Sequence, residues 1–468
     1  MRARLLLGFL FIALLINAVT VYGVVKPISV LPTVETDPVR SAGNCADDCC
    51  IWIHPTDPSL STIIGNDRGN KGGLMVWGLD GKALNSGDAA KSSPGEQMMS
   101  VDLRYNFPLG PLPVTLVGAC IAGSDISSNR ICFYKVNPTT RLLESVGSIP
   151  LSRKFPNGSC MYRSPVTGKY YYFVNWADGQ MEQYELFVSG GKVTGTLVRG
   201  GHKSPFSFGG YIKSCVADDS QGVIYIAKES VAIYKYGAEP GDSGTVPLKM
   251  VDSRNGHLTI RIKGLSLYYK KDGTGYLIAS SQGDSTFAVY TREAGNDYLG
   301  SFTITDSVNP EIDMCTSTEG CDVTNFPLGP SFPKGLFVAQ DYPNTSGKAS
   351  VGSNNFKYVP FENIASALNL TTDTTWDPRK IGREDPRVYL ERLIAYLKEL
   401  GLPKGIENSL CVKVENAANS LAKGNAGAAR NQLKAFLHEV NAQADKKLAG
   451  KEAQFLHEVV AAITVMFD

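Results

Sequence analysis

The sequence predicts an all-β body that forms a propeller, followed by a small α-helical bundle. Three observations lead to this fold class. Short apolar segments alternate with turns rich in Gly, Asp and Asn from about residue 44 to residue 360. The chain contains 47 glycines and 25 prolines, which is typical of a protein with many turns. After residue 360, the spacing of apolar residues changes to the helical period.

The strands of the body are predicted as short apolar runs. So many strands must hide their edges by closing a barrel, by stacking two sheets or by repeating radially, and radial repetition as a propeller fits the length best. Examples are the segments 74–79, 114–119, 131–136, 170–175, 183–187, 223–227, 232–236 and 335–339.

Residues 258–290 are predicted to form a hairpin of chemical interest. Apolar and polar residues alternate from Leu258 to Lys263, which is the period of a half-buried strand. This alternation puts Arg261 and Lys263 on one face, and Gln282 follows the returning strand closely. The two cations form either an anion-binding site or a solvated basic face.

The first 23 residues have the pattern of a signal peptide. Arg2 and Arg4 precede an apolar run from Leu5 to Val19, and a small-residue cleavage site ends at Gly23. The alternative is an uncleaved anchor, but the apolar run is short for a membrane span. No later segment of the sequence is long enough to cross a bilayer, so we expect a secreted protein.

Charge and cysteine content limit the function further. The net charge is +1, so no global charge favours nucleic acid or an anionic membrane. The ten cysteines fit disulfides in a secreted protein, and Cys120/Cys132 and Cys315/Cys321 are close in sequence. The group formed by Cys45, Cys49 and Cys50 could instead suggest a metal, but no partner stands at zinc spacing.

The last part of the chain is predicted to be a separate helical bundle. We expect a propeller domain over residues 24–365, a linker over 366–385 and the bundle over 386–468. Asp385 and Pro386 are typical of the start of a helix. The bundle either stabilises the chain or docks a partner. Its helices are expected at about 386–400, 407–423, 426–443 and 451–467.

Several long motifs are similar to those of one known family. They are ADDCCIWIHPTDP (46–58), VDLRYNFPLG (101–110), GKYYYFVN (168–175), CVADDSQGVIYIAKE (215–229), GYLIASSQGDSTFAVY (275–290), KGLFVAQD (334–341) and NFKYVPFENIA (355–365). In their order along the chain and in their amino-acid sequence, these motifs resemble those of the β-propeller phytases. This resemblance implies a six-bladed β-propeller. It also implies a secreted, calcium-dependent phosphatase that removes phosphate from myo-inositol hexakisphosphate.

The resemblance assigns roles to retained residues. Calcium in that family is held by oxygen ligands, which is the normal preference of this ion. The implied metal ligands are Asp47, Asp48, Glu229, Gln282 and Asp313. The implied catalytic residues are Lys71, Arg68 and Asp313.

The chain departs from the family at several of its site positions. Lys213, Arg261 and Lys263 stand where the family has acids. Asn157, Arg163 and Ala177 replace its phosphate-handling residues. Calcium would be repelled by cations at those positions, so we expect fewer calcium ions at the site or none. Lys213, Arg261, Lys263 and Arg163 are the residues expected to bind an anionic ligand.

Two functions follow from this interpretation. The first is a secreted phytase-like phosphomonoesterase, weakened by loss of calcium ligands, that acts on a phosphorylated small molecule such as inositol hexakisphosphate. The second is a non-catalytic propeller that binds a polyphosphorylated or other anionic ligand without hydrolysing it.

Overall fold

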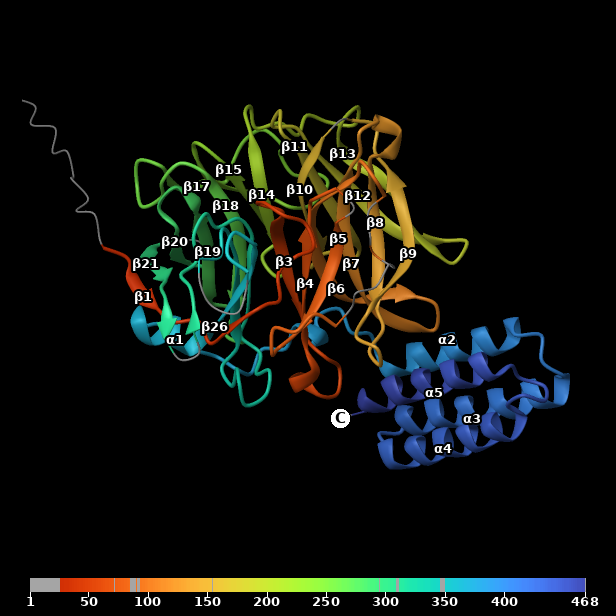
Figure 1. Cartoon of the computed structure of the whole chain (residues 1–468). Coiled ribbons are helices and arrows are strands. Elements are labelled where there is room, and N and C mark those ends of the chain that lie inside the picture. Colours follow the sequence, from red (N-terminus) through yellow and green to blue (C-terminus); the bar gives the residue numbers. More distant parts are fainter. Residues whose placement is uncertain are drawn as a thin grey trace, which may run out of the picture.

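The computed structural model describes residues 26–70, 72–84, 90, 93–153, 155–293, 295–308, 311–345 and 350–467. Antiparallel sheets are arranged around a common axis, and a helical bundle lies beside them (Figure 1). The predicted all-β body with a propeller-like arrangement is therefore confirmed, as are the C-terminal helices. The predicted signal peptide, residues 1–23, lies outside the described residues.

The strands nearest the axis contact one another in a closed series. The order of contact is β3, β6, β10, β14, β18, β24 and again β3. Because each strand begins at the same end of the axis, residues at these starts converge. The bounds are Ala46–Trp52 (β3), Gln97–Leu109 (β6), Pro156–Arg163 (β10), Ile212–Asp218 (β14), Ile262–Tyr269 (β18) and Cys321–Thr324 (β24).

From each inner strand the chain continues outward through antiparallel pairs. One parallel pair, Val193 with Gly147, joins two neighbouring sheets. The outer strands are Thr62–Asp67 (β4), Gly73–Gly78 (β5), Leu112–Ala122 (β7), Arg130–Val136 (β8), Leu143–Pro150 (β9), Tyr170–Trp176 (β11), Met181–Ser189 (β12), Lys192–Gly200 (β13), Val223–Lys228 (β15), Ala232–Gly237 (β16), Lys249–Ser253 (β17), Gly275–Ser281 (β19), Thr286–Thr291 (β20), Tyr298–Ile304 (β21), Leu336–Asp341 (β25) and Asn355–Pro360 (β26). Two short strands, Ser307–Val308 (β22) and Glu311–Ile312 (β23), form a separate pair.

The first strands of the chain complete the last sheets. Ile28–Val30 (β1) pairs in parallel with β21. Val34–Glu35 (β2) pairs antiparallel with β26. Sequence-distant ends of the body are thus held together by backbone hydrogen bonds, which fixes the closure of the ring.

The first strand of the predicted hairpin, from Leu258 to Tyr269, is wrong over residues 258–261. β18 begins only at Ile262. Arg261 has a φ of +65° and is exposed, whereas Lys263 is buried. A residue in the left-handed region breaks the alternation of a strand. Arg261 and Lys263 therefore do not share a face, contrary to the sequence prediction.

Aspartates on the inner strands connect neighbouring sheets. One carboxylate oxygen accepts from the N–H of the next residue in the same strand, and the other accepts from an N–H of the adjacent inner strand. These side chains satisfy backbone donors of the inner strands. The bonds between strands are Ile51 N–H to Asp322 Oδ2 (2.8 Å), Val101 N–H to Asp48 Oδ2 (3.5 Å) and Met161 N–H to Asp102 Oδ2 (2.8 Å).

The predicted disulfides are not present, because all ten cysteines are free thiols in the structure. Cys120 lies opposite Ile131, and Cys132 lies opposite Ala119. Residues opposite each other share a face, and successive residues alternate, so Cys120 and Cys132 point to opposite faces of their sheet. They are too poorly oriented to bond despite their closeness in sequence.

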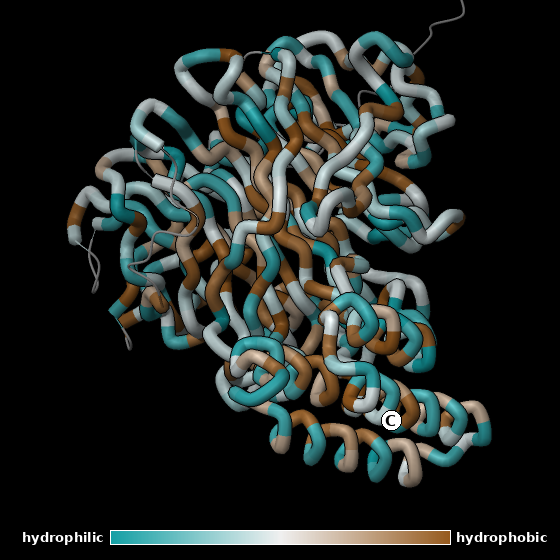
Figure 2. The backbone as a smooth tube through the Cα atoms, turned by 90° about the vertical axis from the view of Figure 1, so that its right-hand side faces the viewer, coloured by the Kyte–Doolittle hydropathy of each residue, from teal (hydrophilic) through white to brown (hydrophobic). Residues whose placement is uncertain are grey.

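The helices at the end of the chain form a bundle with its own core. Asp385 caps the first bundle helix by accepting from Arg387 N–H, and Asn425 caps a later one through Ala428 N–H. Figure 2 shows hydrophobic and hydrophilic residues alternating along these helices. Leu112 of β7 packs against this core. The bounds are Phe361–Ala367 (α1, before the bundle), Pro386–Glu399 (α2), Lys404–Ala422 (α3), Ala426–Gln443 (α4) and Gly450–Val465 (α5).

None of the helices in the described part of the chain combines the length and the apolar character that a membrane span requires.

Candidate functional site

Charged side chains meet where the inner strands begin. Asp47, Lys213 and Lys263 are each the second residue of β3, β14 and β18. Glu319 stands just before β24. Because these strands begin at one end of the axis, their first side chains are brought together there. We call this end the mouth.

The mouth contains a set of ion pairs, which we call the mouth cluster. Lys213 Nζ lies 2.8 Å and 3.0 Å from the two oxygens of Asp47, and 3.6 Å from Glu319 Oε2. Lys263 Nζ lies 2.5 Å from Glu229 Oε1 and 3.3 Å from Glu319 Oε2. The cluster consists of Asp47, Arg68, Lys213, Glu229, Lys263, Gln282 and Glu319.

Arg68 and Gln282 complete the cluster. Arg68 guanidinium nitrogens lie 3.5 Å from Asp47 and 3.9 Å from Glu319. Gln282 Nε2 donates to Glu319 Oε1 at 3.0 Å. The cluster therefore sets three carboxylates against three cations and is close to neutral.

The titration of the cluster reflects these pairs. Burial alone would raise the pKa of Glu319, but Lys213 and Lys263 outweigh burial and lower it to about 2. Burial alone would lower the pKa of Lys213, but Asp47 and Glu319 outweigh it and raise the pKa above its usual range. Both groups are thus held in their charged forms at neutral pH.

The structure brings together most of the sequence-predicted site residues. Asp47, Arg68, Lys213, Glu229, Lys263 and Gln282 are all in the mouth cluster. Sequence reasoning did not select Glu319, although this residue contacts both lysines. Its signal was its position two residues before an inner strand, in the segment that precedes Asp322.

Asp313 lies in a different cluster. Its carboxylate is 2.5 Å from Lys357 Nζ and accepts from Thr345 N–H at 2.5 Å. Lys357 is fully buried and also contacts Glu35 (2.8 Å) and Asp341 (3.2 Å). Asp313 is thus engaged by a fixed cation and does not contact Lys213 or Lys263.

Asp48, although next to Asp47, points to another environment. It bonds backbone N–H groups of β3 and β6, as described above. Burial, and then the charge of Asp47, raise its pKa well above the usual value. Asp48 therefore connects two sheets and is not in the mouth cluster.

Arg163 and Arg261 occupy opposite positions along the axis. Arg163 is the last residue of β10, at the end away from the mouth, and lines a cavity of about 510 Å³ that the linker covers. It therefore does not share a site with Lys213. Arg261 lies just before β18 at the mouth, and is exposed. Lys71 lies outside the described residues.

The residues of the mouth cluster do not fit calcium. Calcium takes six to eight oxygen ligands and needs carboxylates that are free to reach it. Here Asp47, Glu229 and Glu319 each lie within 3.6 Å of a lysine ammonium group. A divalent ion between those oxygens would stand beside two ammonium charges. Within the described ranges, no group of three or more His, Cys, Asp and Glu side chains is arranged to hold a metal.

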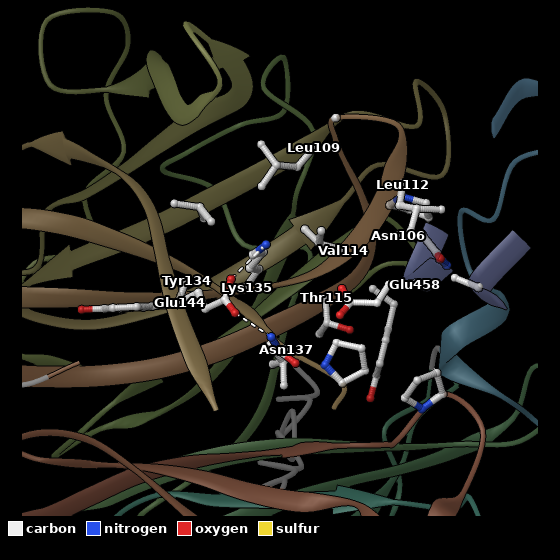
Figure 3. Close-up of a pocket in the computed structure, with 18 of the residues that line it drawn as sticks. Asn106, Leu109, Leu112, Val114, Thr115, Tyr134, Lys135, Asn137, Glu144 and Glu458 are labelled. Carbon is white, nitrogen blue, oxygen red and sulfur yellow. Dashed lines mark hydrogen bonds and ion pairs between the residues drawn. The ribbon is translucent and has the colours of Figure 1, made fainter. Parts of the chain in front are cut away.

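A second concave region lies between the body and the bundle. This cleft has a volume of about 2160 Å³ and is lined by strands β7–β9, the linker, α2 and α5. Figure 3 shows Lys135 and Asn137 both directed at Glu144. Two ion pairs line it, Lys135 with Glu144 and Arg379 with Asp377.

The comparisons with known proteins agree with this architecture. A family profile described as Phytase matches residues 3–384. The chain belongs to the phytase family. It is similar to a 3-phytase from Bacillus subtilis (strain 168), with 40% identity over 356 residues that cover 74% of this chain and 88% of the relative. The bundle helices from Pro386 onward lie outside the family match.

Proposed function

We propose that this chain is a secreted, phytase-like phosphomonoesterase whose turnover of myo-inositol hexakisphosphate is weakened. Family membership and a 3-phytase relative support phosphatase chemistry. The observation that carries the proposed weakening is the position of Lys213 and Lys263, whose ammonium groups engage Asp47, Glu229 and Glu319. The phytase family generally depends on calcium, and Asp47 and Glu229 are among the ligands that the resemblance implies for this ion.

Two further expectations belong to this proposal. The signal-like pattern of residues 1–23 supports secretion. The closed series of contacts between inner strands supports six blades. Docking of a partner by the bundle stays a prediction.

The test is phosphate release from myo-inositol hexakisphosphate, measured beside the Bacillus subtilis 3-phytase. We expect a rate at least about 100-fold below that of the relative, because loss of one preorganised electrostatic group typically costs a factor of that order. Calcium and a chelator are expected to change the rate little. A rate equal to that of the relative, or strong stimulation by calcium, would overturn the proposal.

A charge-reversed variant sharpens this test. We expect Lys213→Glu, Arg261→Asp and Lys263→Glu together to create a carboxylate-rich mouth that binds calcium. Calorimetry with calcium alone reads this out without any activity. A matched control is Lys169→Glu, an exposed residue that pairs with Glu185. If the triple variant binds no more calcium than wild type, the proposed role of these positions is wrong.

The second candidate function is binding without hydrolysis. It is favoured by Arg261, which is exposed beside the mouth cluster and has no ion pair among the described residues. Binding of inositol hexakisphosphate in a chelator, with no phosphate released, would support it. Loss of that binding in Arg261→Asp would show that Arg261 contacts the ligand.

A further inference from the structure

Residues at equivalent positions of three successive sheets surround part of the mouth. Phe155, Tyr211 and Arg261 each stand immediately before an inner strand, namely β10, β14 and β18. We call these three residues the rim row. Their equivalence means that the fold itself places them at one level, just outside the mouth cluster.

Hydrogen bonds connect the chain segments that carry the rim row. Tyr211 Oη donates to Asn157 Oδ1 at 3.1 Å, two residues after Phe155. The carbonyl of Tyr211 accepts from Glu229 N–H at 3.1 Å, and the carbonyl of Glu229 accepts from Ile262 N–H at 2.8 Å. Glu229 thus links the backbone beside Arg261 to Tyr211.

The residues of the rim row are exposed to solvent, and two of them have strained backbone conformations. Phe155 is 65% exposed and Tyr211 is 39% exposed. Phe155 and Arg261 have φ angles of +56° and +65°, which bulky residues seldom adopt. Such conformations persist where the surrounding structure imposes them, and they concentrate at functional sites.

The cations of the mouth cluster differ in their pairing from Arg261, which lies beside them. Lys213, Lys263 and Arg68 are each paired with carboxylates of the mouth cluster. Arg261 is exposed and has no ion pair in the part of the chain that the structure describes. A guanidinium group can bind one phosphate through two parallel hydrogen bonds.

We propose that the rim row is a subsite for a phosphate monoester of a planar aromatic group. Arg261 binds the phosphate, and Phe155 and Tyr211 contact the ring, because aromatic side chains pack favourably against a flat apolar surface. This inference rests on the proposed function in placing a phosphate at the mouth, and it names the class of ligand.

The test compares two probes that carry one phosphate each. Phenyl phosphate has a ring and glycerol 2-phosphate has none. Calorimetry in a chelator is expected to show at least tenfold tighter binding of phenyl phosphate. Phe155→Ala and Tyr211→Ala are each expected to reduce this preference to threefold or less. Arg261→Ala is expected to weaken both probes about tenfold.

Phe187→Ala serves as the matched control. Phe187 is also exposed, at 42%, but lies in β12 near the end away from the mouth. It should keep the full preference. Equal binding of both probes by wild type, or a preference that survives in Phe155→Ala and Tyr211→Ala, would overturn the inference.

Phosphate release separates this inference from the proposed function. Ring-dependent binding without release supports the subsite, and the phosphomonoesterase is refuted only if myo-inositol hexakisphosphate releases no phosphate either. Release from both probes without ring dependence supports the enzyme and refutes the subsite. If neither probe binds, the subsite is refuted.

Discussion

Lysine ammonium groups lie at the centres of two carboxylate clusters in this molecule. Lys213 and Lys263 join Asp47, Glu229 and Glu319 at the mouth. Lys357 joins Glu35, Asp313 and Asp341 near the strands that complete the last sheet. Buried carboxylates are costly unless they are paired. In both clusters, lysine side chains supply the positive charge that pairs with the carboxylates.

Removal of Lys213 should therefore destabilise the fold. We expect Lys213→Met to lower the free energy of unfolding by about 3–5 kcal/mol, because Asp47 and Glu319 lose a buried partner. Urea unfolding followed by circular dichroism measures this. Lys169→Met is the control: its ion pair with Glu185 is more exposed to solvent, so the cost should be much smaller than that of Lys213→Met. Equal costs would contradict the structural role of Lys213.

Glu319 should make stability depend on acid pH. Its pKa falls from the ordinary 4.5 to about 2 in the folded state. The native carboxylate thus releases its proton more readily than the unfolded one. This contribution, about 3 kcal/mol at one pKa unit per 1.36 kcal/mol, is present above pH 4.5 and is lost as pH falls toward 2.

The measurement is the difference in unfolding free energy between wild type and Glu319→Gln across pH 2–6. The difference should shrink as pH falls, because both proteins then carry a neutral side chain at this position. Glu185→Gln, at a more exposed ion pair, should give a nearly flat difference. A flat curve for Glu319→Gln would refute the assignment.

At the scale of elements, regular patterns were predicted well and local irregularities were not. The strand 223–227 lies within β15, and the predicted helix 426–443 is α4. Periodicity carries that information. The left-handed residue Arg261 and the opposite facing of Cys120 and Cys132 depend on register, which sequence spacing does not reveal.

The candidate site was predicted in part for the same reason. Asp47 and Lys213 lie at the starts of inner strands. The propeller brings these starts close together, so the two residues form an ion pair. Asp313 lies in a loop, and its partner Lys357 is distant in sequence, so nothing local indicated their pairing. Glu319 was missed because its role depends on three-dimensional contacts with two lysines.

The aspartates between inner strands give a prediction about elements. Asp322→Ala would leave the buried N–H of Ile51 without its acceptor. We expect a loss of about 1–3 kcal/mol in unfolding free energy. Asp322→Asn retains an oxygen and should lose less. Asp306→Ala, which removes an acceptor for Met314 N–H at an exposed position, should cost little. Chemical denaturation distinguishes these outcomes, and equal losses would show that Asp322 does not connect β24 to β3.

At the scale of the whole molecule, the linker belongs to the body and the bundle does not. Asn325 Nδ2 donates to the carbonyls of Asp373 and Trp376, and Trp376 stacks on Tyr269 with ring centroids 4.3 Å apart. Further along, Asn106 Nδ2 donates to the carbonyl of Ile381. The bundle instead has its own core, against which Leu112 packs.

Two truncations test this division of the chain. A chain that ends at residue 384 keeps every linker contact named above, so its unfolding free energy should differ from that of the body in the full chain by less than about 1 kcal/mol. A chain that ends at residue 369 loses those hydrogen bonds and the Trp376–Tyr269 stack, and uncovers the cavity lined by Arg163 and Asp219. At about 1 kcal/mol for each lost hydrogen bond, it should be at least about 3 kcal/mol less stable. Calorimetry should also show a separate transition for the bundle in the full chain only. If the chain ending at 384 fails to fold while the full chain folds, the body needs the bundle, and the contacts of the linker do not suffice to complete it.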